Sequence, residues 1–107
     1  MSYTVAVTGL SGVIGRKLFD QFPKDSTVID FFHHAPFSDA TNHTYFDLLN
    51  FKNASLSLES VAPDVVIHLA AVTHIDACEM DKPQGEAGIV WRTNVEGTDL
   101  IARYCAK

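Results

Sequence analysis

The spacing of apolar residues changes along the chain, and the changes predict its first elements. Residues 3–8 are rich in β-branched and aromatic side chains and end at Gly9, which predicts a short buried strand. Apolar positions then recur at helical intervals, so we expect a helix over residues 12–22 that Pro23 ends. A second strand is predicted at residues 27–32.

The second half of the chain repeats this alternation after a polar stretch. Residues 33–43 lack a hydrophobic period, which predicts a loop between two extended segments. A short strand at residues 44–46 and a weakly amphipathic helix at residues 50–61 follow. The continuous apolar run at residues 65–71 is typical of a parallel strand buried on both faces. After another polar segment, Pro83 is expected in the first turn of a last helix.

This order of elements predicts an α/β fold of the Rossmann type. Strands that alternate with helices favour a parallel sheet with helices on both faces, and right-handed crossovers give the strand order 3-2-1-4. We interpret residues 1–107 as one domain. Because a doubly wound sheet would continue into another strand, we expect the chain to be truncated after the fourth strand–helix unit.

Composition narrows the classes of protein to which the chain can belong. A hydrophobic content of 47% is enough for a buried core, and the net charge of −5 leaves no basic stripe for nucleic acid. The N-terminus lacks the features of a signal peptide, and the apolar stretch at residues 65–72 is too short to span a bilayer. We therefore expect a cytoplasmic protein that binds neither membrane nor nucleic acid. Cys78 and Cys105 are interpreted as ordinary thiols.

Three glycines lie between the first strand and the first helix. The segment Thr8 to Gly15 reads TGLSGVIG. In this context Gly9 allows a sharp turn, Gly12 allows a pyrophosphate to approach the backbone, and Gly15 allows the helix and strand to pack closely. The helix's first backbone N–H groups then bind the phosphates, so the segment predicts a dinucleotide site.

Residues that follow the other strands agree with this site. Asp30 ends the second strand, where a carboxylate can bind ribose hydroxyls; the alternative is a solvated strand-end acid. Asp47 and Leu48 follow the third strand beside the expected adenine position, although Asp47 could instead cap the next helix. Three residues with mostly small side chains close the fourth strand and would let a cofactor lie across it: Leu69, Ala70 and Ala71.

Together these motifs resemble the extended short-chain dehydrogenase/reductase (NAD-dependent epimerase/dehydratase) superfamily. The resemblance includes the TGxxGxxG turn, Asp30, YFDL at residues 45–48, PDVVIHLAA at residues 63–71 and NVEGT at residues 94–98, and it spans essentially the whole chain. Within the superfamily the chain is most similar to dTDP-4-dehydrorhamnose reductases (RmlD-like). The resemblance implies that these residues contact NAD(P): Gly12, Val13, Ile14, Asp30, Asp47, Leu48, Leu69, Ala70 and Ala71.

The resemblance also implies a cofactor, a substrate class and a supporting residue. Asp30 would disfavour a 2′-phosphate, so we expect NAD(H) to be preferred, although Arg16 and Lys17 leave NADP(H) open. The longer protein would reduce a 4-keto sugar nucleotide. Asn94 is expected to organise water or hold the adjacent strand; the alternative is an ordinary polar helix residue.

Two features of the superfamily's chemistry are missing from these residues. No YxxxK pair occurs, since Tyr104 is followed by Lys107 at three positions rather than four, so we assign no catalytic residue and expect no activity from this chain alone. An epimerase or dehydratase, or a non-catalytic regulatory module, remains an alternative. The five histidines have no metal-ligand spacing, so no metal site is predicted. The fourth strand's outer edge would be unpaired, which predicts homo-oligomers.

Overall fold

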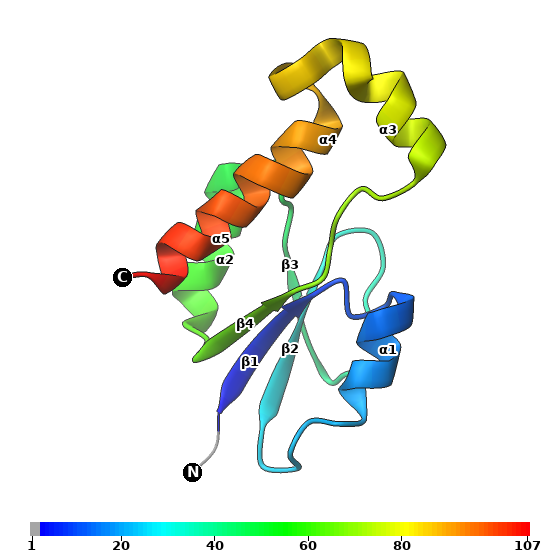
Figure 1. Ribbon diagram of the computed structural model, residues 1–107. Helices are drawn as coiled ribbons and strands as arrows, with labels where there is room; N and C mark the ends of the chain where they lie inside the picture. Colours follow the sequence, from blue (N-terminus) through cyan, green and yellow to red (C-terminus); the bar gives the residue numbers. More distant parts are fainter. Residues whose placement is uncertain (1–2) are drawn as a thin grey trace.

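A computed structural model describes residues 3–107 and shows an α/β fold around a four-stranded parallel sheet (Figure 1). The strands lie in the order β3-β2-β1-β4, so the predicted order 3-2-1-4 is confirmed. Their bounds are β1 (Thr4–Thr8), β2 (Thr27–Phe32), β3 (Asn42–Tyr45) and β4 (Val65–His68). Because all the strands are parallel, their carboxyl ends meet at one edge of the sheet.

Helices cover both faces of this sheet, as the alternation of elements predicted (Figure 1). Side chains of β1 alternate between the faces: Val5 and Val7 pack with apolar residues of α1, whereas Ala6 packs with residues of α2 and α5. The covering helices are α1 (Val13–Phe19), α2 (Phe51–Val61) and α5 (Gly97–Cys105).

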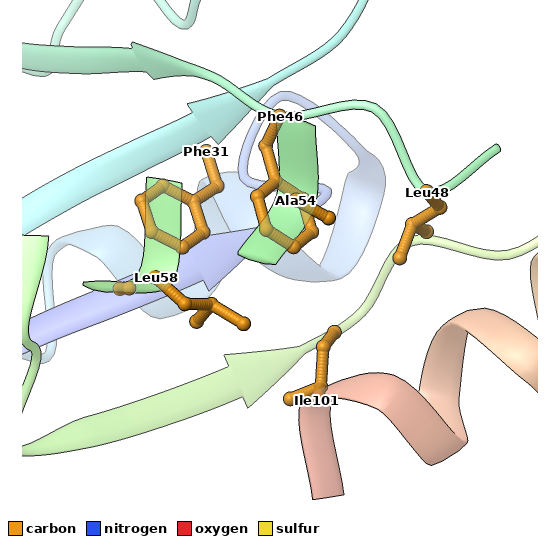
Figure 2. Packing of buried hydrophobic residues seen from close by; sticks show 7 residues of the cluster. Phe31, Phe46, Leu48, Ala54, Leu58 and Ile101 are labelled. Atoms are coloured by element: carbon orange, nitrogen blue, oxygen red, sulfur yellow. The ribbon is translucent and has the colours of Figure 1, made fainter. Parts of the chain in front are cut away.

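The core beneath α2 and α5 lies between these helices and the sheet (Figure 2). Phe31 of β2 stacks on Phe46 with ring centroids 4.6 Å apart and planes 10° apart. Ala54 and Leu58 of α2 and Ile101 of α5 close this cluster from the helix side. The packing fixes the positions at which β2 and β3 end.

Three predicted elements have different bounds in the structure. The fourth strand ends at His68 rather than at residue 71. The first helix ends at Phe19 rather than at residue 22, because Gln21 N–H bonds to Leu18 O in a tight turn. Phe22 still packs into the core from this turn, which explains its place in the apolar period. The third strand covers Asn42–Tyr45 rather than residues 44–46, and Phe46 N–H extends its pairing with one bond to Phe32 O.

The segment between β4 and α5 is more helical than the sequence indicated. The polar stretch contains helix α3 (Ile75–Asp81), and Pro83 lies in the first turn of a 3-10 segment (Lys82–Ala87) rather than of the last helix. That helix starts after Gly88 as α4 (Ile89–Trp91) and passes through a π-helical turn (Arg92–Glu96) into α5.

The new start has a physical reason that spacing did not reveal. Gly85 has φ +55°, which interrupts the helical path after Pro83. Asp81 Oδ2 then accepts a hydrogen bond from Val90 N–H at 2.8 Å and satisfies a donor in the first turn of α4.

The apolar run that forms β4 is typical of a strand buried on both faces, but in this chain the strand is only partly covered. Val65 is exposed and Val66, Ile67 and His68 are only half-buried. Within residues 3–107, β4 pairs with β1 alone, so one edge of the strand has no neighbour.

Candidate functional site

A cavity of about 390 Å³ lies where the four strands end. Its walls come from the turn after β1, the end of β2 and the loop beyond it, the segments after β3 and β4, and two residues near α4. In an open parallel sheet this edge is the usual place for a ligand. Six predicted site residues line it: Gly9, Asp30, Asp47, Leu48, Ala70 and Ala71.

The glycine turn has three distinct steric environments. Gly9 has φ +74°, and a Cβ on it would lie 2.9 Å from Ala70 N, so this position requires glycine. At Gly15 a Cβ would lie only 2.4 Å from Leu10 O, which fixes the helix tightly against the turn. At Gly12 a Cβ would meet only Gly9 O within 4 Å, at 3.3 Å, and otherwise point into open space. A cofactor phosphate could use that space.

Asp30 is buried rather than solvated, with an exposed fraction of 1%. Its Oδ2 accepts a hydrogen bond from Phe37 N–H at 2.6 Å. Phe37 also packs edge-on against Phe19 of α1, with ring centroids 5.2 Å apart. The carboxylate therefore borders the cavity and also anchors the loop between β2 and β3, a role that spacing alone did not indicate.

Asp47 holds the turn that leads into α2. Its Oδ1 accepts a hydrogen bond from Leu49 N–H at 2.9 Å. The residue that caps α2 is Asn50, whose Oδ1 accepts from Asn53 N–H at 3.1 Å, so Asp47 is not the helix cap. Leu48 lies beside it with its side chain in the core (Figure 2).

A hydrogen-bond network joins β1, β4 and α5 beneath the cavity. The Thr8 hydroxyl accepts from Leu69 N–H at 3.0 Å and from Ala70 N–H at 3.1 Å. It therefore donates its proton to His68 Nδ1, 2.6 Å away. Thr98 donates to Asn94 O at 2.7 Å, so its oxygen accepts from His68 Nε2–H at 3.1 Å.

The network holds His68 in one neutral form. Both ring nitrogens are used, one as acceptor and one as donor, and this assignment follows from the hydrogen bonds around them. Burial lowers the pKa of His68 below its ordinary value of 6.5. A neutral ring can accept a hydrogen bond at Nδ1 and donate one at Nε2, as these two contacts require.

Asn94 bonds across to the segment that follows β4. Its Oδ1 accepts from Val72 N–H and its Nδ2 donates to Val72 O, both at 2.8 Å. Asn94 lies in the π-helical turn, and Val72 lines the cavity. The Asn94 side chain thus fixes one residue of the cavity wall without lining the cavity itself.

Five residues predicted to bind the cofactor lie outside the cavity wall. Gly12, Val13, Ile14, Gly15 and Leu69 do not line the cavity; Val13 and Ile14 are exposed, and Leu69 packs near the core under α1. The sequence did not predict the other residues of the cavity wall. Neither a polar loop nor the start of a helix has a hydrophobic period that shows which side chains face a cavity. These other wall residues are Thr8, Leu10, Ser11, residues 31–35, Phe46, Leu49, Val72, Ile89 and Thr93.

Comparison with known protein families shows to which family the chain belongs. The model of the NAD dependent epimerase/dehydratase family matches residues 5–107. The chain belongs to that family. A search of curated proteins gave no match.

Solved structures of this kind share the fold over most of the chain. A hypothetical dTDP-4-dehydrorhamnose reductase from Sulfolobus tokodaii is 26% identical, with a TM-score of 0.78 and coverage of 94% of this chain and 34% of that one. The Bacillus anthracis dTDP-4-dehydrorhamnose reductase in complex with NADP is 21% identical, with a TM-score of 0.73 and coverage of 97% and 32%. The Thermus thermophilus UDP-glucose 4-epimerase complex with NAD is 19% identical, with a TM-score of 0.70 and coverage of 95% and 33%. The chain thus spans about a third of each.

Residues 3–107 contain neither a candidate metal site nor a candidate membrane-spanning helix. No group of three or more His, Cys, Asp or Glu side chains is placed to hold a metal ion. No helix in this part of the chain has the length and apolar character needed to cross a bilayer.

Proposed function

We propose that the cavity binds NAD(H) or NADP(H) and that the chain is the cofactor-binding part of a sugar-nucleotide oxidoreductase. The observation that carries this proposal is the cavity at the carboxyl ends of the strands, which is lined by part of a glycine turn in which a Cβ on Gly12 would meet only Gly9 O. The backbone around Gly12 would face the pyrophosphate, Asp30 a ribose and Asp47 with Leu48 the adenine. The bound nicotinamide would supply hydride chemistry.

The substrate proposal is a 4-keto sugar nucleotide, reduced as in dTDP-4-dehydrorhamnose reductases. The Sulfolobus structure supports this direction because it has the highest identity of the three compared above. Since these 107 residues contain no YxxxK pair, we propose that they do not turn over substrate by themselves.

Cofactor binding is tested by calorimetry with NADH and NADPH. Gly12→Val would place methyl groups in the pyrophosphate's space, so affinity should fall by about 100-fold or more. Ala102→Val, at an exposed position of α5, is a matched control with the same β-branched side chain and should bind normally.

The fold of the variant is checked separately by circular dichroism. A Cβ at Gly12 lies 3.3 Å from Gly9 O, which a small shift can relieve, so the fold should survive; Gly12→Ala serves if it does not. Unchanged affinity in folded Gly12→Val would refute the assignment.

Self-association through β4 is a further part of the proposal. The strand's outer edge has unpaired N–H and C=O groups within the described chain, and such edges pair readily. Sedimentation velocity should show a concentration-dependent dimer. Replacing the exposed Val65 by Lys should weaken it, and a monomer at all concentrations would contradict the proposal.

A further inference from the structure

The cofactor cavity has an unusual set of charges. Among its lining residues, all within residues 3–107, the carboxylates are Asp30 and Asp47, and no Lys or Arg is present. The only lining side chains that can carry a positive charge are His33 and His34. An arginine commonly accommodates the 2′-phosphate of NADP(H) in this fold, and no arginine in residues 3–107 lines this cavity.

Asp30 also holds the loop that carries the two histidines. It is buried, and its Oδ2 is already bonded to Phe37 N–H at 2.6 Å. That bond ties down the loop in which His33 and His34 lie. The geometry makes Asp30 an anchor for the two histidines.

The two imidazoles lie together at the cavity wall next to the end of β2. Their ring centroids are 4.3 Å apart, and the His33 ring is 5.7 Å from that of Tyr45. His33 Nε2 is 3.7 Å from Asp47 Oδ1, and 42% of the His33 side chain is exposed. The ring pair is therefore open to a ligand, and a carboxylate lies close to His33.

Other charges nearby do not replace this pair. Arg16 lies in an adjoining hollow with Asp20 and Asp39, and its Nε donates to Ser11 O at 2.8 Å.

We propose that His33 and His34 select the cofactor by binding the 2′-phosphate of NADP(H) when they are protonated. The inference rests on the proposed cofactor site. Histidine changes its charge between about pH 5 and 8, and a phosphate monoester becomes dianionic above about pH 6. Cofactor choice is therefore pH-dependent: NAD(H) is favoured in mildly alkaline solution, and NADP(H) gains as the pH falls toward neutrality and below. Asp30 is a positioning residue for this pair.

The test compares ADP-ribose with 2′-phospho-ADP-ribose, which differ only in the phosphate. Calorimetry between about pH 8 and 6 should show the affinity ratio moving toward the phosphorylated ligand by about tenfold or more. The double variant His33→Gln with His34→Gln should lose this shift. His43→Gln is the matched control, because His43 does not line the cavity and a glutamine amide can keep its 2.9 Å contact with Ala40 O.

Asp30 variants test the positioning role. Asp30→Asn keeps an oxygen that can accept from Phe37 N–H, so the pH shift should persist, whereas Asp30→Ala releases the loop and should abolish it. If both variants lose the pH-dependent shift equally, the charge of Asp30 itself selects the cofactor, and the positioning role of Asp30 is overturned.

The remaining outcomes separate the two proposals. If ADP-ribose does not bind at all, the cofactor site is refuted and the selection mechanism with it. If ADP-ribose binds but the ratio stays constant with pH, or shifts equally in the double glutamine variant, the cofactor site stands and the histidine mechanism is overturned.

Discussion

Replacing Thr8 by Val tests how strongly the network beneath the cavity holds the end of the sheet. Valine has the same shape and suits a strand, so the change removes a hydroxyl and little else. Thr8 is buried, with 1% of its surface exposed. The hydroxyl serves three groups: Leu69 N–H, Ala70 N–H and His68 Nδ1.

The expected destabilisation follows from which groups lose their partner. Leu69 N–H keeps a second bond to Thr8 O at 3.1 Å, so its loss is small. His68 Nδ1 and Ala70 N–H have no such substitute in the described chain, and an unmet buried polar group costs about 1–3 kcal/mol. Because Ala70 borders the cavity and water can reach it, we expect a total loss of about 2–3 kcal/mol in the free energy of unfolding.

Urea unfolding followed by circular dichroism measures this loss, with the m-value checked for constancy. Thr8→Ser is the control, since it keeps the hydroxyl and removes one methyl group, at a cost of about 1 kcal/mol. A Thr8→Val protein as stable as the Ser variant would refute the reasoning, because the hydrogen bonds of the hydroxyl would then add nothing to the free energy of unfolding.

Three other predictions concern the same scaffold. Because the pKa of His68 is lowered in the folded state, its contribution to the free energy of unfolding is complete above about pH 6.5. This contribution is lost as the pH falls from there through the folded-state pKa. The difference in urea midpoint between the parent and His68→Gln should therefore be smaller at pH 5 than at pH 7.5. Gly15→Ala should prevent folding or lower the melting temperature sharply, because its Cβ would lie 2.4 Å from a backbone oxygen, whereas Gly12→Ala should melt close to the parent; thermal melts compare them. Asn94→Leu should speed hydrogen exchange at Val72 N–H by about tenfold or more, with little change at α2 amides, and unchanged exchange at Val72 would contradict the pairing.

The order of elements and the turn at the first strand could be predicted from the sequence. Alternating periods of two and 3.6 residues are local properties, and parallel strands joined by right-handed crossovers leave few arrangements. The position of TGLSGVIG between a strand and a helix likewise places the candidate site at one edge of the sheet, because the carboxyl ends of β1 to β4 meet there.

The segment from α3 to α4 was harder, because the contacts that shape it lie outside any short window. Pro83 is compatible with a helix start, but the helix that continues into α5 begins only where Asp81 bonds to Val90 N–H. Nothing in the apolar spacing distinguishes these two starts. Only the folded chain brings that carboxylate to the donor.

Spacing gave the identity of the site's candidate residues, and tertiary structure decided what each of them contacts. Asp30 could be placed at a strand end from the sequence, yet its bond to Phe37 N–H depends on how the loop folds back over the sheet. Asn94 reaches Val72 for the same reason, since a hydrogen bond between distant segments needs their relative position, which no local period encodes. The sequence places His33 and His34 in a polar loop. Only the packing of that loop brings them to the wall of the cavity.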